Sequence, residues 1–184
     1  CDLITFEIEH INVDALESLE KIGKAVYPKS NTLRIIQDKN LQKSFFKKNN
    51  IPTSNFKYFN SLYDLKKSIE KNEIKFPCVW KKTKFGYDGF GVKILNSLED
   101  IDKLPNSEMI IEDYILFEKE VSVIVARNVK GDIKCYRTVE MEFNNISNQV
   151  EYVISPANIS DEIDKKAQKI AIKLSESLDC IGLL

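Results

Sequence analysis

The chain has 184 residues, of which 43% are hydrophobic and 30% are charged, a balance that supports a buried core and excludes a disordered tail. A net charge of −1, with both signs interleaved, argues against a nucleic-acid surface, and apolar runs of only a few residues exclude a membrane span. One histidine, His10, and four scattered cysteines argue against a zinc site or a disulfide framework, and favour buried thiols in a reducing cytosol.

The first part of the chain alternates short strands with a helix. Apolar residues at every second position predict a strand over residues 4–8. Asn12 or Asp14 can then cap a short helix that ends near Gly23. The apolar run 25–27 predicts a brief second strand after this helix.

Longer helices are predicted on both sides of the middle of the chain. Apolar residues at helical spacing predict one helix over residues 30–49, which Asn50 and Pro52 end. Another helix is expected over about 61–72. The last helix begins at Ser160, with acidic residues at its positive end.

The remaining middle region is rich in strand patterns. Its strand-like runs are FPCVWKK, VKIL, EMIIEDYI, KEVSVIVARN, IKCYRTVEMEF and VEYVISP. The turn VKGD joins VIVARN to IKCYRTVE, which predicts an antiparallel hairpin. Helices mixed with consecutive strands predict an α+β domain with a substantial antiparallel sheet, split into two lobes.

Half of the six glycines lie in one segment, GYDGFG at residues 86–91. Walker A and Rossmann loops lead into a helix, whereas this loop lies between two strand-like runs, so it is neither. It is either a flap whose backbone N–H groups close over phosphates or an ordinary hairpin loop. Lys81, shortly before the loop, either neutralises such phosphates or ends a strand in solvent. These residues alone leave both alternatives open.

Four carboxylates follow the run MII, namely Glu112, Asp113, Glu118 and Glu120. Carboxylates at strand ends can accept hydrogen bonds from ribose hydroxyls, while the backbone between them contacts an adenine edge. A charged connection facing water is favoured for Glu118. For Glu112 and Glu120, a nucleoside contact and a solvated connection are equally well supported.

Six segments occur in order along the chain: DLITFEIEHIN, IIQDKNLQKSFF, NIPTSNF, FPCVWKKTKFGYDGFGV, IIEDYILFEKEVSVIVARN and ISPANIS. Together they resemble the ATP-grasp family, and within it the 5-(carboxyamino)imidazole ribonucleotide synthetases. The resemblance implies an ATP-grasp fold, in which two lobes with antiparallel sheets clasp ATP. It places the end of an α/β N-terminal domain at 1–40 and an incomplete ATP-grasp domain at 41–184, with a flap lobe over about 54–111 and a catalytic lobe from 112.

Members of this family use ATP to activate bicarbonate as carboxyphosphate and carboxylate 5-aminoimidazole ribonucleotide in purine biosynthesis. The resemblance therefore implies a cytoplasmic ligase that uses ATP and Mg²⁺, binds neither nucleic acid nor membrane, and forms a homodimer. Positioning and charge neutralisation can carry such a phosphoryl transfer without a protein nucleophile. Two alternatives stay open: another ATP-grasp ligase, such as the formate-using glycinamide ribonucleotide transformylase, and a nucleotide-binding module without chemistry.

The resemblance also assigns site residues. For ATP it implies Lys39, Lys81, Gly86, Tyr87, Asp88, Gly89, Phe90, Gly91, Val92, Glu112, Asp113, Tyr114, Ile115 and Glu120. For the ribonucleotide it implies Glu7, Tyr87 and Asp88. Without the resemblance, solvent is favoured for Glu7, which shares a strand face with Glu9. Phe90 and Val92 depart from the basic residue and the Gln that many members have there.

The family's two magnesium-binding acids are expected beyond Leu184, and its glycine-rich first strand before Cys1. We therefore expect both ends to be cut from a longer polypeptide. No metal ligand is predicted within the chain. The 184 residues alone are expected not to catalyse the reaction.

Overall fold

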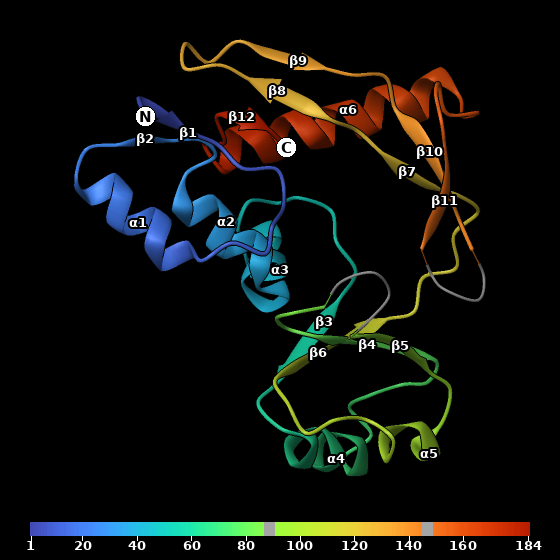
Figure 1. The fold of residues 1–184 in the computed structure, drawn as a ribbon. Helices are drawn as coiled ribbons and strands as arrows, with labels where there is room; N and C mark the ends of the chain where they lie inside the picture. Colours follow the sequence, from blue (N-terminus) through green and yellow to red (C-terminus); the bar gives the residue numbers. More distant parts are fainter. Residues whose placement is uncertain (87–90, 145–148) are drawn as a thin grey trace.

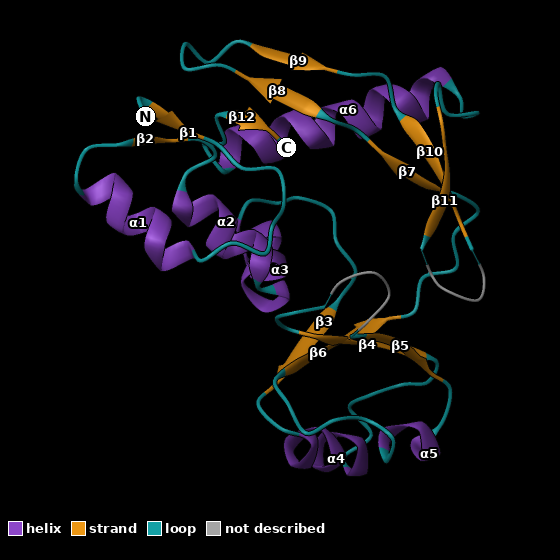
Figure 2. Ribbon diagram, viewed as in Figure 1, coloured by secondary structure: helices purple, strands orange, loops and turns teal. Residues whose placement is uncertain are grey.

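The computed structural model describes residues 1–86, 91–144 and 149–184 (Figure 1). The chain forms an N-terminal helical unit, a middle lobe in which a sheet lies against short helices, and a C-terminal part built around a long helix (Figure 2). The middle lobe projects from the other two parts, and both termini lie away from it. Within the described ranges, no helix is long and apolar enough to cross a membrane.

The N-terminal unit packs three helices beside a small parallel sheet. Its elements are β1 (Leu3–Ile4), α1 (Val13–Lys21), β2 (Ala25–Val26), α2 (Ser30–Gln37) and α3 (Lys39–Lys48). Val13, Leu16 and Leu33 form its buried apolar cluster with β2. Asn12 caps α1, since its side chain accepts a hydrogen bond from the Ala15 N–H at 3.0 Å.

Two predictions for this unit are wrong in extent. The strand expected over residues 4–8 ends at Ile4, because β2 offers only two residues for pairing. The helix expected over residues 30–49 is two helices that meet at Asp38, where φ is −119° and ψ is 111°. The Asp38 side chain accepts hydrogen bonds from two backbone N–H groups of α3, and so begins a new helix there.

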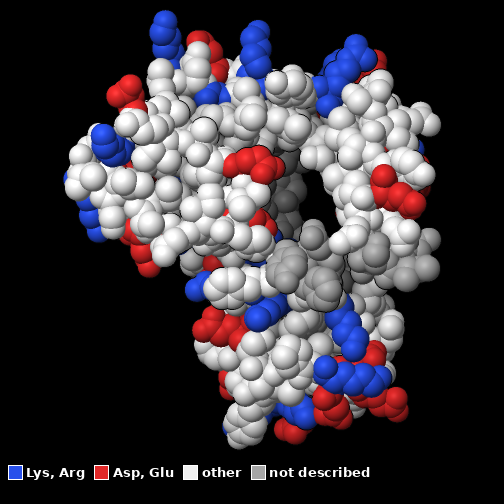
Figure 3. Space-filling view, viewed as in Figure 1, with Lys and Arg blue, Asp and Glu red and all other residues white. Residues whose placement is uncertain are grey.

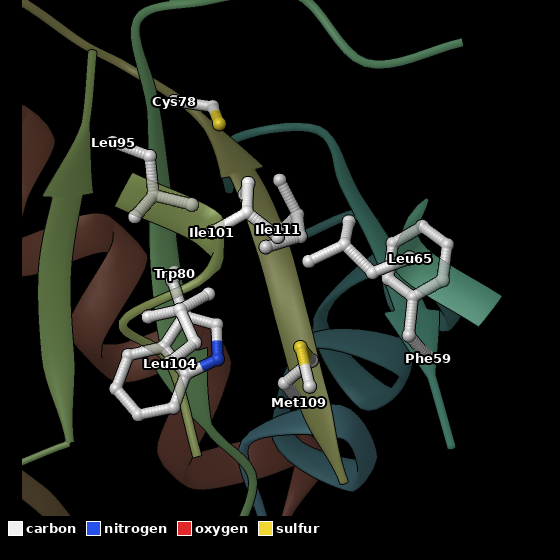
Figure 4. Close-up of a cluster of buried hydrophobic side chains, with 9 residues drawn as sticks. All are labelled: Phe59, Leu65, Cys78, Trp80, Leu95, Ile101, Leu104, Met109 and Ile111. Atoms are coloured by element: carbon white, nitrogen blue, oxygen red, sulfur yellow. The ribbon is translucent and has the colours of Figure 1, made fainter. Parts of the chain in front are cut away.

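The middle lobe is an antiparallel sheet in the order β3-β6-β4-β5, with helices on one face. Its elements are β3 (Phe56–Phe59), α4 (Leu62–Glu70), β4 (Cys78–Lys82), β5 (Val92–Leu95), α5 (Leu98–Ile101) and β6 (Met109–Asp113). On the helix-covered face, the strand residues Trp80, Met109 and Ile111 form one cluster with Leu65 of α4 and Ile101 of α5 (Figure 4). Burial of these side chains holds the sheet and its helices together.

The C-terminal part contains two antiparallel sheets of three strands in its described residues, in the orders β11-β10-β7 and β12-β8-β9. Its elements are β7 (Glu120–Ser122), β8 (Val125–Arg127), β9 (Ile133–Cys135), β10 (Val139–Phe143), β11 (Val150–Ile154), α6 (Asp161–Ser177) and β12 (Gly182–Leu183). The helix α6 packs against β8 and β9 (Figure 1). It begins directly after Ser160, close to the predicted start, and the Ser160 side chain caps it by accepting a hydrogen bond from the Ile163 N–H.

The run KEVSVIVARN, expected as one long strand, is divided between β7 and β8, which belong to different sheets. The run IKCYRTVEMEF divides in the same way into β9 and β10. The chain passes from one sheet to the other at this point, where the Tyr136 N–H donates to the Ile124 carbonyl at 2.9 Å. Apolar alternation continues through such a bend and so cannot reveal it. The predicted hairpin is confirmed as β8 and β9.

The α+β prediction, with antiparallel sheets in two lobes, is confirmed. The sequence did not predict β3, α5 or β12, which have four, four and two residues. Elements this short carry too few residues for a clear periodicity, although the equally short β2 and β5 were predicted from their apolar runs.

Candidate functional site

A buried group of charged side chains lies where the sheet of the middle lobe meets α3. Nζ of Lys43 is 3.0 Å from Oε2 of Glu112, and Nζ of Lys81 is 3.3 Å from the same oxygen. Lys43 also donates to Oγ of Ser54 at 2.6 Å, and the Ser54 hydroxyl donates to Glu112 Oε2 at 2.9 Å. We call these four residues the ionic cluster.

Strand geometry brings two of these residues together. Successive residues of a strand point to opposite faces, so Lys81 and Glu112 point away from the apolar face of the sheet. They occupy diagonal positions on the neighbouring strands β4 and β6, within reach of each other. Lys43 comes from α3, and Ser54 from the segment just before β3. The ionic cluster therefore joins four separate segments of the chain.

Burial and charge oppose each other in the ionic cluster. Burial acts to raise the pKa of Glu112, but the charge of Lys81 and hydrogen bonds from Lys43 and Ser54 outweigh it, so this pKa is lowered. Burial is the main cause that lowers the pKa of Lys43, and the nearby charge of Lys81 adds to it. Because one carboxylate serves two lysines, the ionic cluster carries one positive charge in excess. This excess suits a neighbouring anion.

The glycine segment begins and ends beside this cluster. The Lys82 N–H donates to the Gly91 carbonyl at 2.8 Å, and Gly91 has a φ of +83°. A Cβ at Gly91 would lie 3.2 Å from Cα of Gly86 and 3.3 Å from Cβ of Lys82, so the two ends of the loop touch. Val92, the first residue of β5, is exposed. The predicted ligands Tyr87, Asp88, Gly89 and Phe90 lie outside the described residues.

A cavity of about 570 Å³ lies between the N-terminal unit and the start of the glycine segment. Residues 9–14, residues of α2 and α3, and residues 83–86 line it. Lys39 is one of these, and its backbone N–H donates to the Thr83 carbonyl at 2.8 Å, which ties α3 to the end of β4. Glu9 lines the cavity, whereas the predicted Glu7 is exposed and lies outside its lining.

The segment predicted to bind the nucleoside follows β6. Residues 114–119 have no regular secondary structure, so their backbone groups are not committed to a strand ladder. Tyr114 and Ile115 are exposed, and Asp113 is held by Asn55, whose side chain donates to it at 2.8 Å. Glu120, at the start of β7, is half-buried. On the face drawn in Figure 3, the molecule is hollowed between the N-terminal helices and the sheet of β7, β10 and β11.

Lys43, Ser54 and Asp38 were not predicted from the sequence as site residues. A usable signal for Lys43 was its position four residues after Lys39, which places both lysines on one side of a helix. Ser54 lies in the segment NIPTSNF, but no local pattern there singled it out, because its role depends on the packing of α3 against the middle lobe. Across the described parts of the chain, no group of three or more His, Cys, Asp or Glu residues is arranged to hold a metal ion.

Family models match both parts of the chain. The model of the ATP-grasp domain matches residues 44–184, and the model described as the ribonucleotide synthetase preATP-grasp domain matches residues 1–37. The bifunctional purine synthesis protein purC/E of Dictyostelium discoideum is 37% identical over 191 residues, covering 100% of this chain and 19% of that protein. The chain spans less than half the length of the curated relatives it matches.

Solved structures give the same family. The N5-carboxyaminoimidazole ribonucleotide synthetase of Thermotoga maritima has a TM-score of 0.83 and 37% identity, with 99% of this chain and 45% of that chain covered. The N5-carboxyaminoimidazole synthase of Aspergillus clavatus, solved with ADP and 5-aminoimidazole ribonucleotide, has a TM-score of 0.85 and 30% identity, with 100% and 48% covered. These matches confirm the ATP-grasp fold expected from the sequence.

Proposed function

Since the chain belongs to the ATP-grasp family and is similar to N5-carboxyaminoimidazole ribonucleotide synthetases, we propose that the full-length protein is an ATP-dependent carboxylating ligase. It uses ATP to activate bicarbonate as carboxyphosphate and transfers the carboxyl group to the amine of 5-aminoimidazole ribonucleotide in purine biosynthesis. The observation that carries the proposal is the ionic cluster beside the two ends of the glycine segment. Its excess positive charge suits the phosphates of ATP.

In this proposal the residues act by binding and charge neutralisation. Lys39 and Lys81 neutralise phosphates, and the segment from Gly86 to Val92 closes over them. Residues 112–115 bind the nucleoside, with Tyr114 and Ile115 offering backbone groups that lie outside the strand ladder, and Glu120 adds a further contact. Phosphoryl transfer to bicarbonate needs preorganised positive charge and water exclusion, which these groups can supply without a protein nucleophile.

The cavity of about 570 Å³ is the proposed site of the ribonucleotide. Its size lies within the ordinary range of small-molecule sites, which is about 300–1,000 Å³. Lys39 among its lining residues offers positive charge to a phosphate, whereas Arg34 and Lys84 are paired with Asp14 and Asp38. The backbone of residues 9–14 offers polar groups. Glu7, Tyr87 and Asp88 remain proposed ligands at the edge of this site.

The proposal includes Mg²⁺, which would reduce the charge on the ATP phosphates when bound. On the family resemblance, its ligands are proposed to lie beyond Leu184 in the full-length protein. A cytoplasmic location and a homodimer also belong to the proposal, on the strength of the family resemblance alone.

The test is ADP release by the purified full-length protein supplied with MgATP, 5-aminoimidazole ribonucleotide and bicarbonate. We expect release that needs both the ribonucleotide and bicarbonate, and a loss of roughly hundredfold in Lys81→Met because an electrostatic contact to the phosphates is removed. Lys66→Met, on the exposed side of α4, is the matched control and should keep full activity.

Two outcomes would replace this proposal with its rivals. ADP release stimulated by formate and glycinamide ribonucleotide, but not by bicarbonate, would indicate the transformylase reaction. Tight ATP binding without ADP release under either condition would indicate a nucleotide-binding module without chemistry.

A further inference from the structure

Lys43 contacts both segments, called crossings below, that connect the middle lobe to the rest of the chain. The chain enters the lobe at Ser54 and leaves it at Glu112, and Lys43 contacts both residues from α3. The next residues along the chain are also paired, since the Asp113 N–H donates to the Asn55 carbonyl at 3.0 Å. One side chain on α3 therefore fastens the two crossings together at the base of the lobe.

The two lysines that share Glu112 differ in exposure. The side chain of Lys43 is 9% exposed and that of Glu112 is 8% exposed, whereas that of Lys81 is 31% exposed. Lys43 is enclosed and has Ser54 as a second acceptor, so it has little freedom to move away. Lys81 is the member of the ionic cluster that can turn toward a ligand.

We propose that Lys43 is the fixed counter-ion of Glu112, and that it frees Lys81 to exchange this carboxylate for the phosphate groups of a nucleoside triphosphate. Lys43 is thus a positioning residue that acts through Glu112 and Lys81 without touching the ligand. The inference rests on the proposed function, because it assumes that Lys81 binds nucleotide phosphates.

The physical reason is the cost of an unpaired buried charge. When Lys81 leaves Glu112, the carboxylate keeps Lys43 and the Ser54 hydroxyl as partners, so it stays compensated. Without Lys43, departure of Lys81 would leave the buried carboxylate with a single neutral partner in the ionic cluster, which is strongly unfavourable. Glu112 would then hold Lys81 and compete with the phosphates for it.

The experiment measures the dissociation constant of the non-hydrolysed analogue AMP-PNP, using the full-length protein and four variants. In Lys43→Met we expect the dissociation constant to rise by roughly tenfold or more, which is the effect of one lost contact to a charged group. In the Glu112→Gln background the same Lys43→Met change should alter binding by less than about threefold, because Lys81 is no longer held there. Lys47→Met is the matched control, since Lys47 is one turn further along α3 and lies over Phe56, and it should bind like wild type.

The cycle separates a specific role from general damage. Equal losses on Lys43→Met in both backgrounds, or wild-type binding by Lys43→Met, would overturn the proposal. If Lys43→Met alone does not fold, the double variant removes both charges together, and its binding is compared with Glu112→Gln. A weakening of more than about threefold in that comparison would also contradict the proposal. Wild-type protein that fails to bind AMP-PNP would instead count against the proposed function.

Discussion

The two faces of the sheet in the middle lobe are built from the same strands but differ in chemistry: one face is apolar and the other carries the ionic cluster. On one face Trp80 and Ile111 pack against α4 and α5 in an apolar cluster. On the other face the next residues along the strands, Lys81 and Glu112, are charged and form an ion pair. Glu112 also contacts Lys43 of α3 and the Ser54 hydroxyl. The apolar face gains stability from burial, whereas the charged face gains little, because desolvation offsets the attraction between its charges. Packing on the apolar face therefore stabilises β4 and β6, and these strands hold Lys81 and Glu112 in position on the charged face.

Removing apolar volume should give the largest effect. Met109 is fully buried on the apolar face, so Met109→Ala should lower the free energy of unfolding by about 3 kcal/mol through lost packing and a cavity. Urea denaturation of the full-length protein measures this loss. The dissociation constant for AMP-PNP in the folded fraction should not change. A large change in nucleotide affinity would show that the two faces are less independent than their structure indicates.

Removing the charge of Glu112 should give a smaller loss. We expect Glu112→Gln to cost about 2 kcal/mol near neutral pH, because the amide keeps hydrogen bonds but leaves the lysines without a counter-charge. The pH dependence separates this from a packing defect. The pKa of Glu112 is lowered from 4.5 in the folded state, so its stabilisation is complete above that value and is lost as pH falls through the lowered pKa.

Urea denaturation at several pH values tests this sign. Between about pH 6 and pH 3, wild type should lose more stability than Glu112→Gln, since other acidic groups titrate alike in both proteins. Parallel curves would mean that the Glu112 carboxylate contributes no linkage. The charged face would then resemble an ordinary surface.

An exposed ion pair in the same lobe should show the smallest effect. Lys57 and Glu73 are 3.1 Å apart with side chains about half exposed. Solvent screens such pairs, so Lys57→Ala should leave the urea midpoint unchanged within error. A shift as large as that of Glu112→Gln would contradict the view that burial distinguishes the ionic cluster from other ion pairs.

Local sequence patterns predicted the features that depend only on neighbouring residues. Asn12 was one of the two predicted caps of α1. The start of α6 near Ser160 and the hairpin around the VKGD turn were also predicted, because a helix start or a turn depends on a few neighbouring residues. The break of the helix at Asp38 was missed, although Asp is a good cap, because the apolar spacing runs on through it. The division of KEVSVIVARN was missed because a strand that changes sheets keeps its alternation.

By itself the sequence determined the α+β class, the glycine segment between two strands, and the family to which the chain belongs. It also singled out Lys81 and Glu112 as charged residues at strand ends. Only the tertiary structure decided that these two residues form the ionic cluster with Lys43 and Ser54. The physical reason is that the balance between desolvation and ion pairing depends on burial, and burial arises only when segments far apart in the sequence pack together.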